Sequence, residues 1–303
     1  MQPDRKLDFV SGEVFAVDKP LRWTSFDAVK RLRGAIQRRL GVRKFKVGHA
    51  GTLDPLATGV LIICTGKATK LIDELQSGEK EYIATLKLGA TTPSFDLETE
   101  IDSRRPWQHI TEELVREALG RFRGQILQVP PVYSAVKIDG KRAYKFARKG
   151  KEVELKSKAV SIPEIELISF AAPEATIRVV CSKGTYIRAL ARDIGEDLGC
   201  GAHLTALRRI RVGRFSAPES SAEGMGQALS IDEALEIIGS AELSLPDEWL
   251  AEHPLPEKRP ADRPQPEKRE ESKMHILDES HRPADRPLPE TDDDPGRGDG
   301  TYC

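Results

Sequence analysis

One acidic side chain stands out because of the residues around it. Asp54 lies among three glycines, Gly48, Gly51 and Gly59, and just ahead of the apolar run at 60–64. Glycine tolerates positive φ and lets a ligand or another backbone come close, and the proline after Asp54 favours an extended backbone. The pattern predicts a loop that presents one carboxylate, a group able to attack as a nucleophile or to remove a proton. An Asp-Pro pair that only begins a turn is the alternative.

The elements that must position this loop follow from hydrophobic periodicity. Phe15–Val17 reads as a strand, and Ser25 can cap a helix with an apolar stripe ending at Leu40. A buried strand is expected over 60–64 and an alternating strand over 82–88. Further helices are expected at 68–75, 111–122 and 186–198, and further strands at 165–170, 176–181 and 204–209. Since helices and strands do not alternate regularly, the predicted fold class is α+β.

The charge is segregated along the chain. The net charge is -1, but residues 251–303 carry 14 acidic and 9 basic side chains, while residues 1–250 carry 34 and 38. Residues 19–47 hold ten Lys or Arg against Asp27 alone, and residues 121–158 hold eleven against three acids, interleaved with aromatic residues. Such clusters neutralise phosphates and offer stacking surfaces for bases, which favours a nucleic-acid partner. Solvated helix faces are the alternative.

Composition excludes several classes of protein. The chain has 303 residues, of which 39% are hydrophobic and 31% charged, as in a soluble globular protein. It has neither an apolar run long enough to span a membrane nor the apolar core of a secretory signal at its N-terminus, so we expect a cytoplasmic protein. Its four scattered cysteines form no Cys-x-x-Cys pair, which predicts neither a zinc site nor a disulfide framework.

Two segments differ from the body, which we place at 10–250. Residues 124–158 read as a protrusion, with a proline pair at 130–131, a tight turn at 139–140 and a basic helix over 142–149. From about residue 251 the chain holds nine of its 20 prolines and repeats Arg-Pro-Ala-Asp-Arg-Pro. We expect this tail to be disordered, because it cannot bury enough apolar surface to offset the entropy of ordering.

Five motifs, in this order along the chain, carry a resemblance to a known family. Besides the Asp54 loop, which follows Lys19-Pro20, they are Lys80-Glu81-Tyr82, Pro130-Pro131-Val132-Tyr133-Ser134-Ala135, the segment 184–193 and the segment 203–209. Over residues 10–215 the chain resembles the TruB family of tRNA pseudouridine synthases. The resemblance implies a pseudouridine synthase fold with a central mixed sheet and flanking helices. It also implies conversion of the T-loop uridine at tRNA position 55 to pseudouridine, without a metal or an organic cofactor.

The resemblance implies a role for each matching residue. Asp54 is expected to be catalytic, with Arg188 as its ion-pair partner. Tyr82 is expected to stack on the uracil, and residues 124–158 to grip the T-loop. The remaining expected substrate-binding residues are Lys19, His49, which helps to shape the site, Tyr186, and Leu207, which forms an apolar wall.

Pseudouridine formation explains why these residue types occur together. The N-glycosidic bond breaks, the base rotates and a carbon–carbon bond forms, with nothing oxidised. Such an enzyme needs one ionised carboxylate, a dry pocket and a way to extrude the uridine. A non-catalytic tRNA-folding chaperone is the alternative, but a pure binder has no need of a carboxylate that repels phosphate. Action on other RNAs as well is a third possibility.

The chain also departs from the family pattern. Many relatives read Thr-Asp-Thr-x-Asp after the Tyr82 strand, and here only Asp96 of the run 92–96 keeps an acid. Residues 216–250 are too short for the RNA-binding PUA domain that ends many relatives. We therefore expect affinity to come from the body, no guide-RNA-directed activity and no obligate protein partner. The expected partner is the T-stem-loop of tRNA, with no membrane involved.

Overall fold

The computed structural model describes residues 6–134, 137–138, 141–142, 155–219 and 226–255. These residues belong to a compact unit spanning Met1–Glu257. The turn expected at 139–140, most of the basic helix expected over 142–149 and the tail from residue 256 lie outside them.

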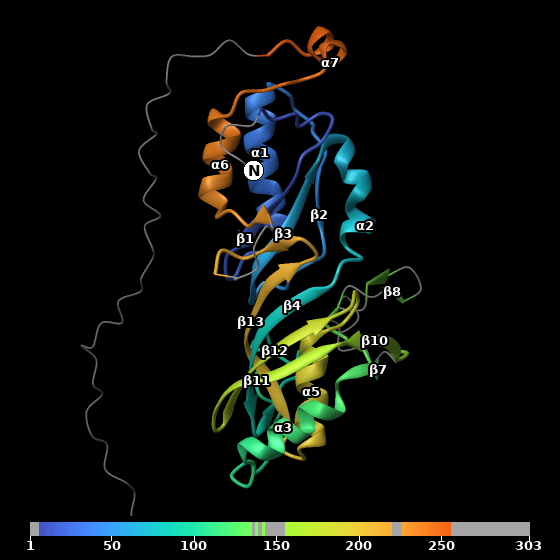
Figure 1. The fold of residues 1–303 in the computed structure, drawn as a ribbon, viewed down its shortest axis with the longest axis vertical. Helices are drawn as coiled ribbons and strands as arrows, with labels where there is room; N and C mark the ends of the chain where they lie inside the picture. The colour runs from blue at the N-terminus through green and yellow to red at the C-terminus, as the bar shows by residue number, and fades with distance from the viewer. Residues whose placement is uncertain (1–5, 135–136, 139–140, 143–154, 220–225, 256–303) are drawn as a thin grey trace, which may run out of the picture. The chain divides into compact units, whose positions relative to one another are not determined.

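A mixed sheet forms the centre of the fold and confirms the α+β class. Its main path runs β1-β3-β13-β4-β12-β11, so that β13 lies between β3 and β4 (Figure 1). The strands are β1 (Val14–Lys19), β3 (Ala57–Thr65), β13 (Ala202–Val212), β4 (Lys80–Leu88), β12 (Glu174–Cys181) and β11 (Glu164–Ala171). Only β3 and β13 are parallel along this path, and the other neighbours are antiparallel. The parallel pair therefore joins two antiparallel halves.

Short strands extend the sheet or pair apart from it. On the sheet, β2 (Val47–Ala50) pairs with β3, and β14 (Phe215–Ser216) pairs with β13 and β15 (Gly226–Gln227). The separate pairs are β5 (Ala90–Thr91) with β6 (Ser103–Arg104), β7 (Gly124–Gln128) with β10 (Lys158–Ile162), and β8 (Lys137–Ile138) with β9 (Lys141–Arg142). The pairing of β7 with β10 closes the base of the expected protrusion.

The helices divide between the two halves of the sheet. The α1–α6 pair, formed by α1 (Ser25–Leu40) and α6 (Ile231–Ser240), packs against β1 and β3, whereas α3 (Glu112–Arg121) and α5 (Ile187–Asp197) lie beside β4, β11 and β12 (Figure 1). The other helical segments are η1 (Gly66–Leu71), α2 (Ile72–Leu75) and α7 (Asp247–Glu252). Among the described residues, no helix combines the length and the apolar character needed to cross a membrane.

Each half has its own apolar core. The first core packs α1 and α6 on β1 and β3, with Leu32, Ile36, Leu61 and Ile63 at its centre. A second joins α3 and α5 to the antiparallel strands and is the larger of the two. A third, smaller core covers the opposite face of β1 and β3. The second core includes Ala57 of β3 and the third includes Val212 of β13, so these two cores help the pairing of β3 with β13 to hold the halves in register.

Gly59 shows why the glycines around Asp54 are needed. The expected buried strand begins at Ala57 rather than at residue 60, so Gly59 lies inside β3 with φ at +105°. A Cβ at this position would lie 2.1 Å from the backbone oxygen of Arg209 on β13. Only glycine permits this approach of the two strands.

Two sequence expectations about helices were wrong or incomplete. Thr24, not Ser25, caps α1, since the Thr24 side chain accepts a hydrogen bond from the backbone of Asp27 and Asp27 returns one. Ser25 is the first helical residue, and its hydroxyl reaches the loop before Asp54 instead. Helix α6 was not predicted, although Ser230 and Glu233 form a capping box at its start.

Candidate active site

The Asp54 loop is tied down at both ends. The Ser25 hydroxyl donates to the Leu53 carbonyl at 3.0 Å and accepts from the Leu53 N–H at 2.8 Å. Beyond the acid, the Arg22 N–H donates to the carbonyl of Pro55 at 2.8 Å. Gly51 turns the chain out of β2 with φ at +99°. The loop is therefore an ordered support for the carboxylate, and α1 contributes part of that support.

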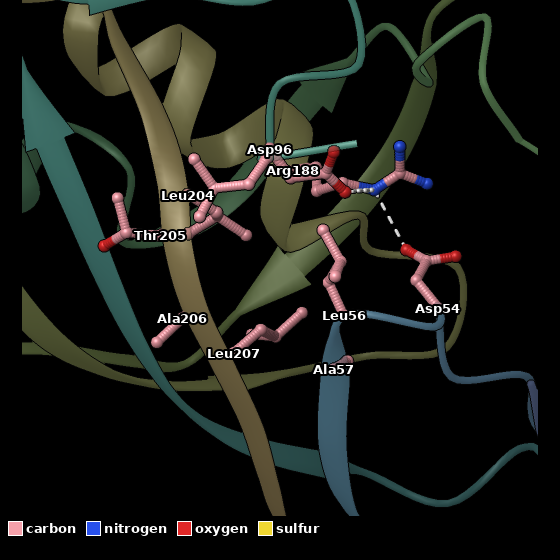
Figure 2. A pocket seen from close by; sticks show the side chains of 10 residues that line it. Asp54, Leu56, Ala57, Asp96, Arg188, Leu204, Thr205, Ala206 and Leu207 are labelled. Carbon is pink, nitrogen blue, oxygen red and sulfur yellow. Dashed lines mark ion pairs between the residues drawn. The ribbon is translucent and has the colours of Figure 1, made fainter. Parts of the chain in front are cut away.

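Arg188 lies at the centre of the site. It sits in the first turn of α5, is buried, and places its Nε 2.9 Å from Asp54 Oδ2 and 3.6 Å from Asp96 Oδ2 (Figure 2). Its Nη1 donates to the Ser94 carbonyl at 3.0 Å and its Nη2 to the Tyr133 carbonyl at 2.8 Å. One guanidinium thus joins two carboxylates and two backbone segments, a use of the planar fork that lysine cannot reproduce.

Asp96 is held by its own segment. Ser94 Oγ donates to Asp96 Oδ1 at 2.6 Å, and the backbone N–H of Glu98 donates to the same oxygen at 2.9 Å. The other oxygen is left for Arg188. Ser94 stands within the run in which the chain departs from the family pattern, and here it orients the acid that remains. Asp96 is nearly buried, whereas the side chain of Asp54 is 39% exposed, so Asp54 is the carboxylate that a substrate can reach.

A cavity of about 250 Å³ opens beside this ion pair. Five of the seven expected site residues line it, namely Asp54, Tyr82, Tyr186, Arg188 and Leu207. They come from the Asp54 loop, β4, α5 and β13, so the cavity forms where the two halves of the sheet meet. A smaller void of about 20 Å³ lies between the same ion pair and residues 204–207 of β13 (Figure 2).

Two tyrosines give the cavity an aromatic lining. Tyr82 on β4 is nearly buried, and burial raises the pKa of its hydroxyl. Burial also raises the pKa of Tyr186, so both side chains stay neutral at physiological pH. The Gln128 amide accepts from the Tyr186 N–H at 2.8 Å and donates to the Tyr186 carbonyl at 3.2 Å. Strand β7 thereby fixes the start of the helix that carries Arg188.

The other two expected residues, His49 and Lys19, do not line the cavity. Burial, together with the charge of Arg209, lowers the pKa of His49, and its Nδ1 is buried without a hydrogen-bond partner in the described part of the chain. Lys19 is fully buried at the end of β1, and its Nζ donates to the carbonyls of Pro20 at 2.9 Å and Trp23 at 2.6 Å. Burial lowers the pKa of Lys19 to about 8, against an opposing effect of Asp54. Lys19 thus braces the turn that leads into α1.

Two cations in the cavity wall were not singled out from the sequence. Arg209 is buried, and it donates from Nε to the Val60 carbonyl at 2.8 Å and from Nη2 to the Gly51 carbonyl at 3.1 Å. Lys80 donates to the carbonyls of Gln76 and Gly78, and burial lowers its pKa to about 8. Arg209 is the last residue of the motif 203–209, and Lys80 is the first residue of the motif Lys80-Glu81-Tyr82. Their place in these motifs was the only sequence signal that could have marked them as site residues.

Comparison with known proteins agrees with this geometry. The profile of the N-terminal domain of TruB family pseudouridylate synthases matches residues 37–187, and that of the tRNA pseudouridylate synthase B C-terminal domain matches 188–235. A tRNA pseudouridine synthase B of Phocaeicola vulgatus is 64% identical over 233 residues, which cover 77% of this chain and 99% of that protein. The chain belongs to the TruB family. It is accordingly a pseudouridine synthase, an isomerase.

More distant TruB family members and solved structures extend the comparison. The tRNA pseudouridine synthase B of Thermobifida fusca is 49% identical over 216 residues, covering 69% of this chain and 72% of that protein. A chain in the crystal structure of a Cbf5-Nop10-Gar1 complex matches with a TM-score of 0.54 and 28% identity, over 75% of this chain and 54% of that chain. The archaeal box H/ACA sRNP Nop10-Cbf5 complex gives a TM-score of 0.52 and 26% identity, over 77% and 57%. The fold is therefore one that this chain shares with these solved structures.

Proposed function

We propose that this pseudouridine synthase isomerises the uridine at position 55 in the T-loop of tRNA, with Asp54 as the reacting carboxylate. The observation that carries the proposal is the Asp54–Arg188 pair at 2.9 Å in the wall of a cavity that two tyrosines also line. The relatives named tRNA pseudouridine synthase B support tRNA as the substrate.

The cavity suits a uridine that has left its stack. A base inside an RNA helix or loop is out of reach, so the enzyme must extrude it and bind it in a pocket. Tyr82 offers a π-face to the extruded base, a contact worth roughly 1–3 kcal/mol. Leu207 forms an apolar wall that excludes water. Arg188 holds the Asp54 carboxylate in place, so little reorganisation is needed when the glycosidic bond breaks.

Residues 124–158 are proposed as the insertion that grips the T-loop, within a catalytic domain that we place at 10–250. The described base of the insertion supports this, because β7 contacts the site through Gln128 and Tyr186. Asp54, Tyr82 and Arg188 all come from one chain, which supports an enzyme without an obligate protein partner. The bacterial relatives with tRNA-modifying names support a cytoplasmic reaction.

The decisive experiment maps pseudouridine in an unmodified tRNA transcript after incubation with the protein. We expect product at position 55, and loss of at least a thousandfold in single-turnover rate for Asp54→Asn with little change in tRNA affinity. Asp73→Asn, which changes an exposed carboxylate on α2, is the matched control and should behave as the parent protein. Absence of product with the parent protein, alongside retained binding and refolding of tRNA, would favour the chaperone alternative.

A further inference from the structure

The solvent face of α1 is a basic surface that the proposed reaction leaves without a role. A shallow hollow of about 510 Å³ lies along this helix. Four cations line it, namely Lys30, Arg31, Arg33 and Arg38, with Trp23 at one end and Gly34 in the middle. We call this surface the α1 basic face.

These cations are available to a ligand. Within the part of the chain that the structure describes, none of the four forms an ion pair, and Arg33 instead lies 5.6 Å from the ring centre of the exposed Phe26. Asp27 is the acid in the hollow; its Oδ2 accepts from the Thr24 N–H at 2.9 Å and the Thr24 hydroxyl at 2.6 Å, and its single negative charge offsets only part of the charge of the four cations. The α1 basic face therefore presents positive charge that the described fold leaves unpaired.

No packing contact in the described structure requires a glycine at position 34. A Cβ there would lie 3.5 Å from Arg38 Nη1, which is an ordinary contact, and the residue sits in the interior of a 16-residue helix. Glycine is the poorest helix former after proline, so an alanine would suit the helix better. A gap in the middle of a row of cations lets a bulky anion approach the helix closely, as glycines do where backbone and ligand meet.

The helix that carries the α1 basic face begins beside the active-site loop. The first residue of α1, Ser25, bonds the loop that carries Asp54, and the Arg22 N–H bonds the Pro55 carbonyl. At 1.5 Å per residue, the helix leads about 24 Å away from that loop. A ligand with its reacting base in the cavity and a long polyanionic remainder has the shape and charge to follow this path.

We propose that the α1 basic face binds the sugar–phosphate backbone of the tRNA outside its target loop, with a phosphate group over Gly34. The proposal rests on tRNA as the substrate of the proposed function. Each phosphate contact of this kind adds affinity that weakens as the salt concentration rises.

The first test removes charge without altering the cavity. The variant is the double substitution Arg31→Gln and Arg38→Gln, and the probes are a full-length tRNA transcript and an isolated T-stem-loop. We expect full-length affinity to fall about tenfold and the slope of log affinity against log salt to shrink by about two, while stem-loop affinity stays within twofold. The matched control is Lys87→Gln with Arg104→Gln, two exposed cations on β4 and β6, which should change neither value.

The second test, Gly34→Ala, separates binding from folding. If the glycine exists to admit a phosphate, alanine raises the melting temperature and lowers full-length tRNA affinity severalfold. Unchanged full-length affinity in both this variant and the double variant would overturn the proposal. The single-turnover rate on the stem-loop, at saturating protein, reports on the active-site cavity and not on the α1 basic face, so failure of the proposed reaction and failure of the α1 basic face are seen in different measurements.

Discussion

At the scale of single residues, Arg188 is the group on which most of the site depends. Its guanidinium bonds Asp54, the Ser94 carbonyl and the Tyr133 carbonyl, and lies beside Asp96. Lysine keeps the charge but lacks the fork, so Arg188→Lys leaves some of these groups unpaired in a buried setting. We expect the free energy of unfolding to fall by about 3 kcal/mol and the single-turnover rate by at least a hundredfold.

Urea unfolding and single-turnover kinetics measure the two effects. Arg116→Lys is the control, because Arg116 forms an exposed pair with Glu112 on α3 and such pairs contribute little. An Arg188→Lys protein as stable and active as the parent would show that charge alone suffices at this position.

Lys19 predicts a pH dependence of stability. Burial lowers its pKa to about 8 from 10.5, so above pH 8 the unfolded chain binds a proton that the folded protein does not. The free energy of unfolding therefore rises with pH in this window, by about 2 kcal/mol between pH 8 and 9.5 from this residue, and below pH 8 the contribution is flat. Urea unfolding at pH 7, 8 and 9.5 measures the rise. Lys19→Met should remove this part of it, and equal slopes in the two proteins would contradict the assignment.

At the scale of elements, two neighbouring residues at the start of α1 have different roles: one caps the helix and the other supports the Asp54 loop. Thr24 caps the helix, whereas Ser25 bonds both backbone groups of Leu53, just before the Asp54 carboxylate. Ser25→Ala leaves those two groups unpaired, so we expect about 1–3 kcal/mol lower stability and a lower kcat with KM nearly unchanged. Thr24→Ala should cost about 1 kcal/mol with kcat retained. Equal effects of the two variants on kcat would mean that the Leu53 contact does not position the loop.

The same pair of residues shows what the sequence could and could not predict. Apolar runs and alternation located β1, β3, β4, β11, β12 and β13 to within a few residues, because burial on a sheet leaves that pattern. Neighbouring Thr24 and Ser25 are both good caps, and the choice between them depends on Leu53, which is 28 residues from Ser25. Local pattern cannot contain such a contact.

The same distinction, between local sequence patterns and contacts of distant residues, holds for the candidate site. Motifs and order pointed to Asp54, Tyr82, Tyr186, Arg188 and Leu207, which the structure brings to one cavity. The role of Arg209 as a support could not be predicted, because its guanidinium crosses from β13 to the carbonyls of Val60 and Gly51 on distant parts of the chain. Helix α6 does carry a local signal, because Ser230 and Glu233 have the spacing of a capping box.

At the scale of the whole molecule, the body should carry the activity without the tail. The cavity, the three apolar cores and the α1 basic face all lie within residues 6–255. The relative from Phocaeicola vulgatus is covered almost entirely by 77% of this chain, so the remainder has no counterpart there. Removing residues 256–303 should leave the melting temperature and turnover unchanged. Since this segment is acidic, tRNA affinity at low salt should stay equal or rise. A clear loss of affinity would assign the tail a binding role.

The junction of the two halves has a consequence for how the enzyme fails. Asp54 lies in the loop that leads into β3, and Arg188 lies in the opposite half. The parallel pairing of β3 with β13 consists of three residue pairs, Leu207 with Ala57, Arg208 with Thr58 and Arg209 with Gly59. Opening this pairing would part the two charges and break the contacts that the second and third cores make across it, through Ala57 and Val212, while the first core lies on one side of it. Heat inactivation should therefore coincide with the loss of these two cores, and an intermediate that keeps the core of α1 and α6 would still hold RNA on α1 but no longer modify it.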